Sequence, residues 1–176
     1  MATLQLTDTE IAEIQVLIGN ATAIRGLAPA EIRSGIILGA ASDYVFERIR
    51  QSLNIEELPT EEAKTAARRF ADDTDDDIAN FIAIVLKPPQ QQQIKRAVIY
   101  RCAGLCVPIV KEVTQETAAG IQQGLRSQSL DEKQENFFQR ADEEILRLNK
   151  AFNSDAFSGS FAAKKARVTL FTATRS

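Results

Sequence analysis

Apolar residues recur at steps of three and four along most of this chain, which is the spacing of one face of an α-helix. The first such stretch follows Thr7 and Glu10, a pair spaced as a capping box, and runs as far as Gly19. The second begins at Pro29, where the first helical turn loses no needed backbone donor, and extends to about Leu53. The pattern therefore predicts a short helix followed by a longer one.

The predicted helix over residues 29–53 has one face of larger residues and a stripe of small ones. The first face consists of Ile32, Ile36, Ala40, Tyr44 and Val45. The stripe consists of Gly35, Gly39, Ala40 and Ala41. Each glycine lowers helix propensity by roughly 1 kcal/mol, so the stripe favours a helix that is stabilised by packing. We expect another helix to approach closely over it.

Two further helices are predicted before Pro88 and Pro89. Residues 61–71 are charged and weakly amphipathic, so we expect this helix on the surface. Residues 72–77 hold five aspartates and precede apolar residues at helical spacing, namely Ile78, Phe81, Ile82 and Val85. We expect Thr74 to cap this helix and the aspartates to face its positive end, at about 0.3–1 kcal/mol each. The alternative is a Ca²⁺ site, but the run lacks the glycine of a Ca²⁺-binding loop.

A buried central helix is predicted after the proline pair, which ends the preceding helix. It is rich in small and apolar residues, namely Ile94, Ala97, Val98, Cys102 and Leu105, with Arg101 among them. We expect Pro108 to kink or end it, and residues 113–128, with Gly120 and Gly124, to form a loop or short hairpin. A second capping box at Ser129 then opens a last helix, whose apolar residues are Phe137, Phe138, Ala141, Ile145, Leu148 and Phe152.

The composition changes at Asn153. Residues 153–176 carry Lys164, Lys165, Arg167 and Arg175 against Asp155 alone, a net charge of +3. Within this segment, residues 167–172 are rich in strand formers but have no obvious partner strand in the sequence. We therefore predict a mainly α fold: a compact helical bundle over residues 1–152, with a short loop or hairpin, and an extended C-terminal tail over residues 153–176.

Composition narrows the classes of function. The chain has 176 residues and a net charge of −3, so it lacks the positive field of a protein that wraps DNA. It contains no histidine, which removes the usual general base and the commonest metal ligand. No glycine spacing matches a phosphate-binding loop. We therefore expect no enzyme, no cofactor and no metal site.

The cysteines, the apolar runs and the N-terminus together indicate the compartment in which the protein is made. Cys102 and Cys106 lie four residues apart on one helix face, so they cannot form a disulfide framework, and we expect inert core residues. The longest apolar runs have six residues, against about 20 for a membrane helix. The N-terminus shows no targeting signal, so we expect synthesis in a cytoplasm.

This layout resembles the head-to-tail adaptor, or connector, proteins of tailed bacteriophages. The resemblance covers roughly residues 7–152. It rests on four features: the early amphipathic helix, the Ala-rich stretch from Gly39 to Val45, the Pro88-Pro89 break before residues 94–98, and the late helix through residues 140–145. The acidic run and the helix over residues 61–71 make this chain longer than the smallest members of the family.

The resemblance implies a structural virion protein at the head-to-tail junction. Such a subunit would form a ring, expected to be dodecameric, that docks beneath the portal protein, extends the DNA channel and offers a platform for the next neck or tail-side protein. DNA would pass through without specific binding, because acidic groups repel its phosphates. No catalysis and no membrane are implied.

We expect the tail, from about Phe157, to be disordered or loosely held in a free subunit and ordered against the portal or a neighbouring subunit. Strand addition is the suggested mode of binding. Backbone pairing along residues 167–172 would supply affinity, with apolar contacts from Val168, Leu170 and Phe171 and charge contacts from Lys164, Lys165 and Arg167. The alternative is a frayed, solvated terminus.

Two other classes of function remain open. A helical DNA-binding regulator is suggested by the basic residues around the second predicted helix, namely Arg25, Arg33, Arg48 and Arg50. Against it, no helix concentrates basic residues without nearby acids. An enzyme that holds Mg²⁺ through the aspartates of residues 72–77 is the third class.

Overall fold

The chain folds into α-helices that follow the apolar spacing of the sequence. The computed structural model describes residues 3–18, 27–70, 75–117 and 131–152, with the backbone alone for 75–76 and 110–117. Every regular element within these ranges is helical, which confirms the mainly α fold class. In this part of the chain, no helix combines the length and the apolar character that crossing a membrane requires.

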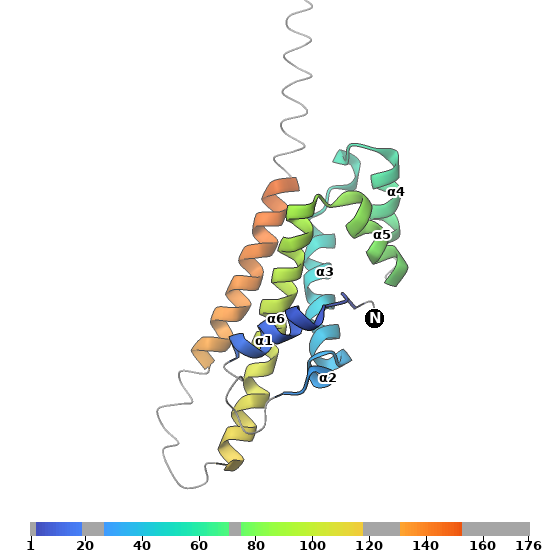
Figure 1. Cartoon of the computed structure of the whole chain (residues 1–176). Coiled ribbons are helices and arrows are strands. Elements are labelled where there is room, and N and C mark those ends of the chain that lie inside the picture. The colour runs from blue at the N-terminus through green and yellow to red at the C-terminus, as the bar shows by residue number, and fades with distance from the viewer. Residues whose placement is uncertain (1–2, 19–26, 71–74, 118–130, 153–176) are drawn as a thin grey trace, which may run out of the picture.

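Three helices run side by side and form the body of the molecule (Figure 1). They are α3 (Ala40–Ser52), α6 (Pro88–Thr117) and the last helix (residues 131–152). The middle helix, α6, runs antiparallel to the other two, and α1 (Asp8–Leu17) lies across it. Their facing side chains form the core and are at most 1% exposed at Val45, Ile49, Val98, Cys102, Ala141 and Leu148.

The predicted capping box at the start of α1 is confirmed. The Glu10 amide donates to the Thr7 hydroxyl at 3.3 Å, and the Glu10 carboxylate accepts from the Thr7 amide at 2.7 Å. The segment before the box is also fixed, because Leu4 and Leu6 are buried and the Leu4 amide donates to the buried Ser42 hydroxyl at 3.2 Å. The N-terminal segment is thereby attached to α3.

The prediction of a single helix over residues 29–53 is wrong, because the helix is interrupted at Ser34. A short helix, α2 (Pro29–Ile32), ends there, and the Ser34 backbone is extended, with φ −62° and ψ 155°. A π-helical turn, η2 (Gly35–Gly39), then leads directly into α3. The break rotates the following residues away from the predicted face, so Ile36 is 82% exposed while Ile32 is fully buried.

At the two glycines of the small-residue stripe, the predicted close helix approach does not occur, although Gly39 and Ala41 are buried. A Cβ atom added at Gly35 or at Gly39 would meet no described atom within 4 Å outside its own helix backbone and its chain neighbours. The close approach lies instead at Gly104 in α6, where an added Cβ would come 2.6 Å from Cδ1 of Phe138 in the last helix. This glycine lets α6 and the last helix pack tightly.

The helix predicted over residues 61–71 forms as α4 (Glu61–Phe70) and has one face on the surface as expected, but it is strongly and not weakly amphipathic. A 3-10 turn, η3 (Ile55–Glu57), leads to it, and it packs against α5 (Asp75–Val85) at one end of the body (Figure 1). Its alanines Ala63, Ala66 and Ala67 are buried together with Phe70. Small side chains therefore form a tight helix contact here.

The proline pair separates two helices as predicted, and of the two alternatives for Pro108, ending the helix does not occur. Pro88 and Pro89 follow the end of α5 and occupy the first turn of α6, where the Lys87 amide donates to the Gln90 side chain at 2.8 Å. Pro108, in contrast, lies inside α6, which continues to Thr117. The predicted loop or hairpin is therefore wrong for residues 113–117, and residues 118–128 lie outside the described part.

Candidate functional site

The last helix is joined to α3 by two polar contacts that lie about two turns apart. The Tyr44 hydroxyl donates to Oδ1 of Asp142 at 2.8 Å, and the Ser52 hydroxyl donates to Oδ1 of Asn149 at 2.7 Å. Both pairs advance in the same direction along the two helices, as expected for helices that run parallel. These contacts fix the register of the last helix against α3.

A cation between two aromatic rings completes this junction. The Arg101 guanidinium of α6 lies 3.8 Å from the centre of the Tyr44 ring and 4.0 Å from that of Phe138. Cation–π contacts of this kind contribute about 0.5–2 kcal/mol, depending on burial. We call Tyr44, Arg101, Phe138 and Asp142 the Arg101 cluster, and it links all three helices of the body.

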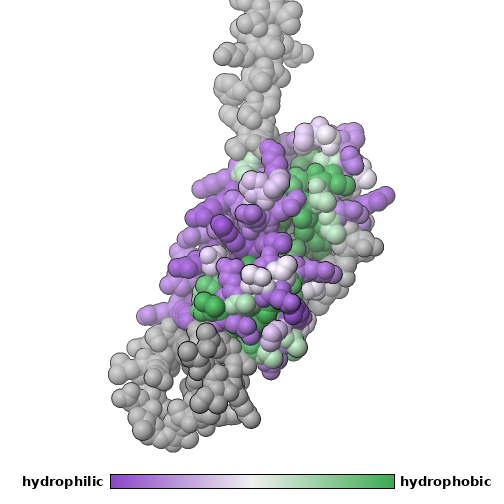
Figure 2. Space-filling model, in the orientation of Figure 1, coloured by the Kyte–Doolittle hydropathy of each residue, from purple (hydrophilic) through white to green (hydrophobic). Residues whose placement is uncertain are grey.

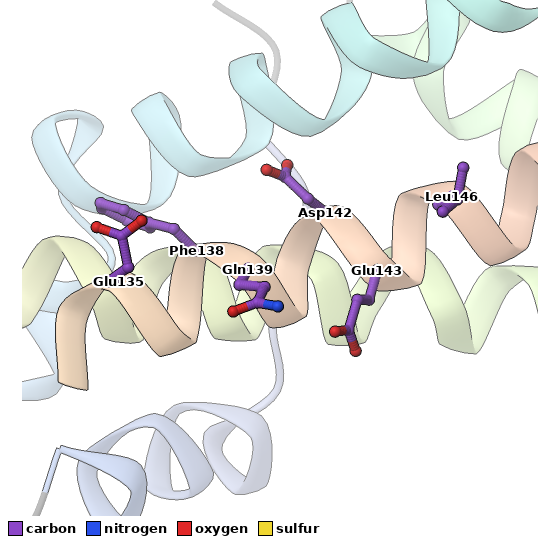
Figure 3. A pocket seen from close by; sticks show the side chains of 6 residues that line it. All are labelled: Glu135, Phe138, Gln139, Asp142, Glu143 and Leu146. Carbon is purple, nitrogen blue, oxygen red and sulfur yellow. The ribbon is translucent and has the colours of Figure 1, made fainter. Parts of the chain in front are cut away.

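Beside the Arg101 cluster, the last helix carries an open groove of about 360 Å³. We call it the acidic groove, and its lining residues are Glu135, Phe138, Gln139, Asp142, Glu143 and Leu146 (Figure 3). Three of the six are carboxylates and none is a cation. Glu135 and Glu143 are exposed and form no ion pair with any residue that the structure describes, whereas Asp142 accepts the Tyr44 hydrogen bond.

The acidic groove combines charge with apolar surface. Leu146 is 53% exposed, although most of the surface along this helix is hydrophilic (Figure 2). Beside the groove, the Arg101 guanidinium lies against the Phe138 ring, and the Arg48 guanidinium donates to the Tyr44 hydroxyl at 3.4 Å. That hydrogen bond and the charge of Asp142 raise the pKa of Arg48. Carboxylates and an exposed leucine suit binding of a basic, partly apolar segment.

The arginines that suggested DNA binding make contacts within the fold. Arg33 pairs with Asp8, and Arg50 donates to the Phe70 carbonyl at 3.1 Å and stacks on the Phe70 ring at 4.8 Å. Arg48 contacts Tyr44 of the Arg101 cluster, and Arg25 lies outside the described residues. Arg33 and Arg50 thus connect separate elements, whereas Arg48 contacts Tyr44 of its own helix.

The two cysteines have the inert character predicted for them. Cys102 and Cys106 are free and fully buried in α6. Burial raises the pKa of Cys106 to about 12, aided by the charge of Glu31, and burial raises the pKa of Cys102 as well, aided by Cys106. Both thiols therefore stay protonated at neutral pH and behave as small core residues.

The residues predicted to bind partners lie outside the part of the chain that the structure describes: Lys164, Lys165, Arg167, Val168, Leu170 and Phe171. The same holds for Thr74 and for the capping box at Ser129, and of the acidic run only Asp77 has a described side chain. Within the described residues, no three histidine, cysteine, aspartate or glutamate side chains lie together as a metal site would require.

Comparisons of this chain with protein-family models, with curated proteins and with solved structures found no match.

Proposed function

We propose that this chain is a structural subunit of a tailed-bacteriophage virion, a head-to-tail adaptor that forms a ring beneath the portal. The ring extends the DNA channel and joins the capsid to the neck and tail. It is expected to hold twelve copies, to let DNA pass without specific binding, and to perform no catalysis. Residues 1–152 form the helical adaptor body, and residues 153–176 form a tail that docks on a partner.

The observation that supports this proposal is the helical character of the four segments that carry the family resemblance. The early helix is α1, and the stretch from Gly39 to Val45 runs from η2 into α3. Residues 94–98 lie in α6, separated from the proline pair by four residues, and residues 140–145 lie in the last helix. Three of these segments lie in the helices of the body, and α1 lies across that body. The four segments are therefore packed together in one unit.

The proposal is tested by mixing the full chain with the portal protein of the same genome and measuring the mass of the complex. We expect one portal assembly to gain a ring of subunits of 19.4 kDa each, twelve in number if the family expectation holds. Absence of any complex with the portal would contradict the proposal. A monomeric mass without portal would not, because the ring can form on the portal itself.

A second measurement separates this proposal from the DNA-binding regulator. The full chain is titrated against duplex DNA at low and at physiological salt. An adaptor with an acidic body binds duplex weakly at both concentrations, whereas a regulator binds tightly and loses affinity steeply as salt rises. Tight, salt-sensitive binding would favour the regulator and contradict the adaptor.

A further inference from the structure

We infer that the acidic groove receives residues 161–171 of a second copy of this chain. The inference deepens the proposed function, since it names the contact that joins neighbouring subunits, and it rests on self-assembly of the chain and not on the portal. The receiving residues are Glu135, Glu143 and Leu146, with Phe138 as the floor beside the Arg101 cluster.

The charges of the two surfaces are complementary. Residues 161–171 contain Lys164, Lys165 and Arg167 and no acidic residue. The groove offers the carboxylates Glu135 and Glu143, which form no ion pair within the described part of the chain, and Asp142 lies between them on the same helix. Opposite charges on two surfaces of one protein speed their encounter and select the register of docking.

The lengths also correspond. Glu135 and Glu143 are eight residues apart in one helix, so they lie about 12 Å apart along its axis. The three cations, from Lys164 to Arg167, cover about 10 Å in an extended chain. Apolar residues follow the cations at Val168 and Leu170, just as the exposed Leu146 follows Glu143 along the groove. One extended segment can therefore engage both kinds of surface at once.

The occupant is a second copy because the proposed ring requires a contact between subunits. Glu135 lies 17 residues before the helix end at residue 152, which is about 26 Å along the axis. Lys164 follows residue 152 by twelve positions, about 40 Å in an extended chain, so distance alone does not separate the two arrangements. A groove and a segment at different places on one chain give the head-to-tail contact that closes rings, and the crosslinking test distinguishes this contact from docking within one copy.

The test places a photo-crosslinking amino acid at Gln139, an exposed groove position, in the full chain. Copies labelled with ¹⁵N are mixed with unlabelled copies, and crosslinked peptides are identified by mass. We expect crosslinks from position 139 to residues 161–171 that join a labelled to an unlabelled copy. The same crosslinker at Glu62, an exposed position on α4, serves as the control and should not reach that segment.

Charge reversal provides the second arm. Glu135→Lys with Glu143→Lys, and separately Lys164→Glu with Lys165→Glu, should each reduce the yield of the intermolecular crosslink about tenfold, as expected when about 1.4 kcal/mol of attraction is lost. Combining all four changes should restore it. Glu57→Lys with Glu62→Lys alters the net charge equally on another surface and should leave the yield unchanged.

Three results would overturn the inference: crosslinks to residues 161–171 only within one copy, no crosslink to that segment, or a yield that charge reversal does not change. Circular dichroism of each variant shows that the helices are intact. A chain that forms this crosslink but fails to bind the portal would refute the adaptor function and leave the inference standing. Portal binding without the crosslink would support the adaptor function and refute the inference.

Discussion

At the scale of single residues, Gly104 sets how closely α6 and the last helix approach. Because an added Cβ would come 2.6 Å from Cδ1 of Phe138, the ring must move and its contact with Arg101 must change. We expect Gly104→Ala to lower the free energy of unfolding by about 1–3 kcal/mol, the usual cost of overpacking. Urea denaturation followed by circular dichroism measures it.

Gly39→Ala is the matched control for this prediction. Gly39 has a right-handed helical backbone, with φ −60° and ψ −55°, and an added Cβ would meet nothing within 4 Å. The same substitution should therefore raise the free energy of unfolding by about 0.5–1 kcal/mol, because alanine favours the helix over glycine. A similar loss at both positions would show that the contact with Phe138 is not the cause.

Single residues could be assigned from the sequence only where neighbours along the helix determine their surroundings. Cys102 and Cys106 repeat the spacing of other apolar residues in α6, so their burial was predictable. Gly104 is special because of Phe138, which is 34 positions away, and Arg101 because of rings on two other helices. Nothing in the local pattern indicates either contact.

At the scale of elements, Phe70 fastens the α4–α5 pair to the body. Its ring stacks on Phe81 of α5 at 4.1 Å between centres and meets Phe46 of α3 edge-on at 5.8 Å. We expect Phe70→Ala to lower the free energy of unfolding by about 3–5 kcal/mol, through lost apolar burial and the cavity left behind. Hydrogen exchange should also become faster in α4 and α5 than in α6, because the pair loses its anchor.

Ile84→Ala on the same helix pair is the control for Phe70→Ala. Ile84 is 42% exposed, so its removal should change the free energy of unfolding by no more than about 0.5–1 kcal/mol. If Phe70→Ala were as mild as this control, the aromatic contacts would not hold the pair to the body.

Helix starts were more predictable than helix interruptions. The boxes and prolines that open α1 and α6 act within one turn, so a local pattern identifies them. The break at Ser34 has no such marker in the local sequence. It is explained only by the packing, since it allows α2 to bury Ile32 and α3 to bury Val45. Pro108 costs a helix about 3 kcal/mol, yet α6 continues, since the buried Cys106 and Val107 beside it hold the turn in the core.

At the scale of the whole molecule, the sequence predicted that helices form but not which of them meet. The last helix packs beside α3, and the hydrogen bonds of Asp142 and Asn149 fix its position there. Those partners are 98 and 97 positions apart in the chain. Helical periodicity already places the acids and Leu146 on one face of the last helix, at steps of three and four residues, but only the assembled fold shows that Asp142 of this face accepts a hydrogen bond from Tyr44.

The attachment of α1 to α6 makes the stability of the molecule depend on pH. Burial alone would raise the pKa of Glu10, but hydrogen bonds from Thr7 and from the Lys95 ammonium, 2.9 Å away, hold that pKa below its ordinary value. The folded chain thus binds fewer protons than the unfolded chain near pH 4. This contribution to stability is fully present above about pH 4.3, the ordinary glutamate pKa, and is lost as pH falls through the lowered pKa.

We expect Glu10→Gln to lower the free energy of unfolding by about 1 kcal/mol at pH 7, because the neutral amide keeps the cap but loses the charge that pairs with Lys95. The gap between wild type and variant should close as the pH falls well below 4, where the native carboxyl group is protonated in both states. Urea denaturation at pH 7 and at pH 3 measures the gap. The exposed Glu13 of the same helix supplies the control, since Glu13→Gln should change the free energy of unfolding by less than about 0.5 kcal/mol at pH 7. A gap for Glu10→Gln that is as large at pH 3 as at pH 7 would show that the loss comes from the cap and not from the ion pair between α1 and α6.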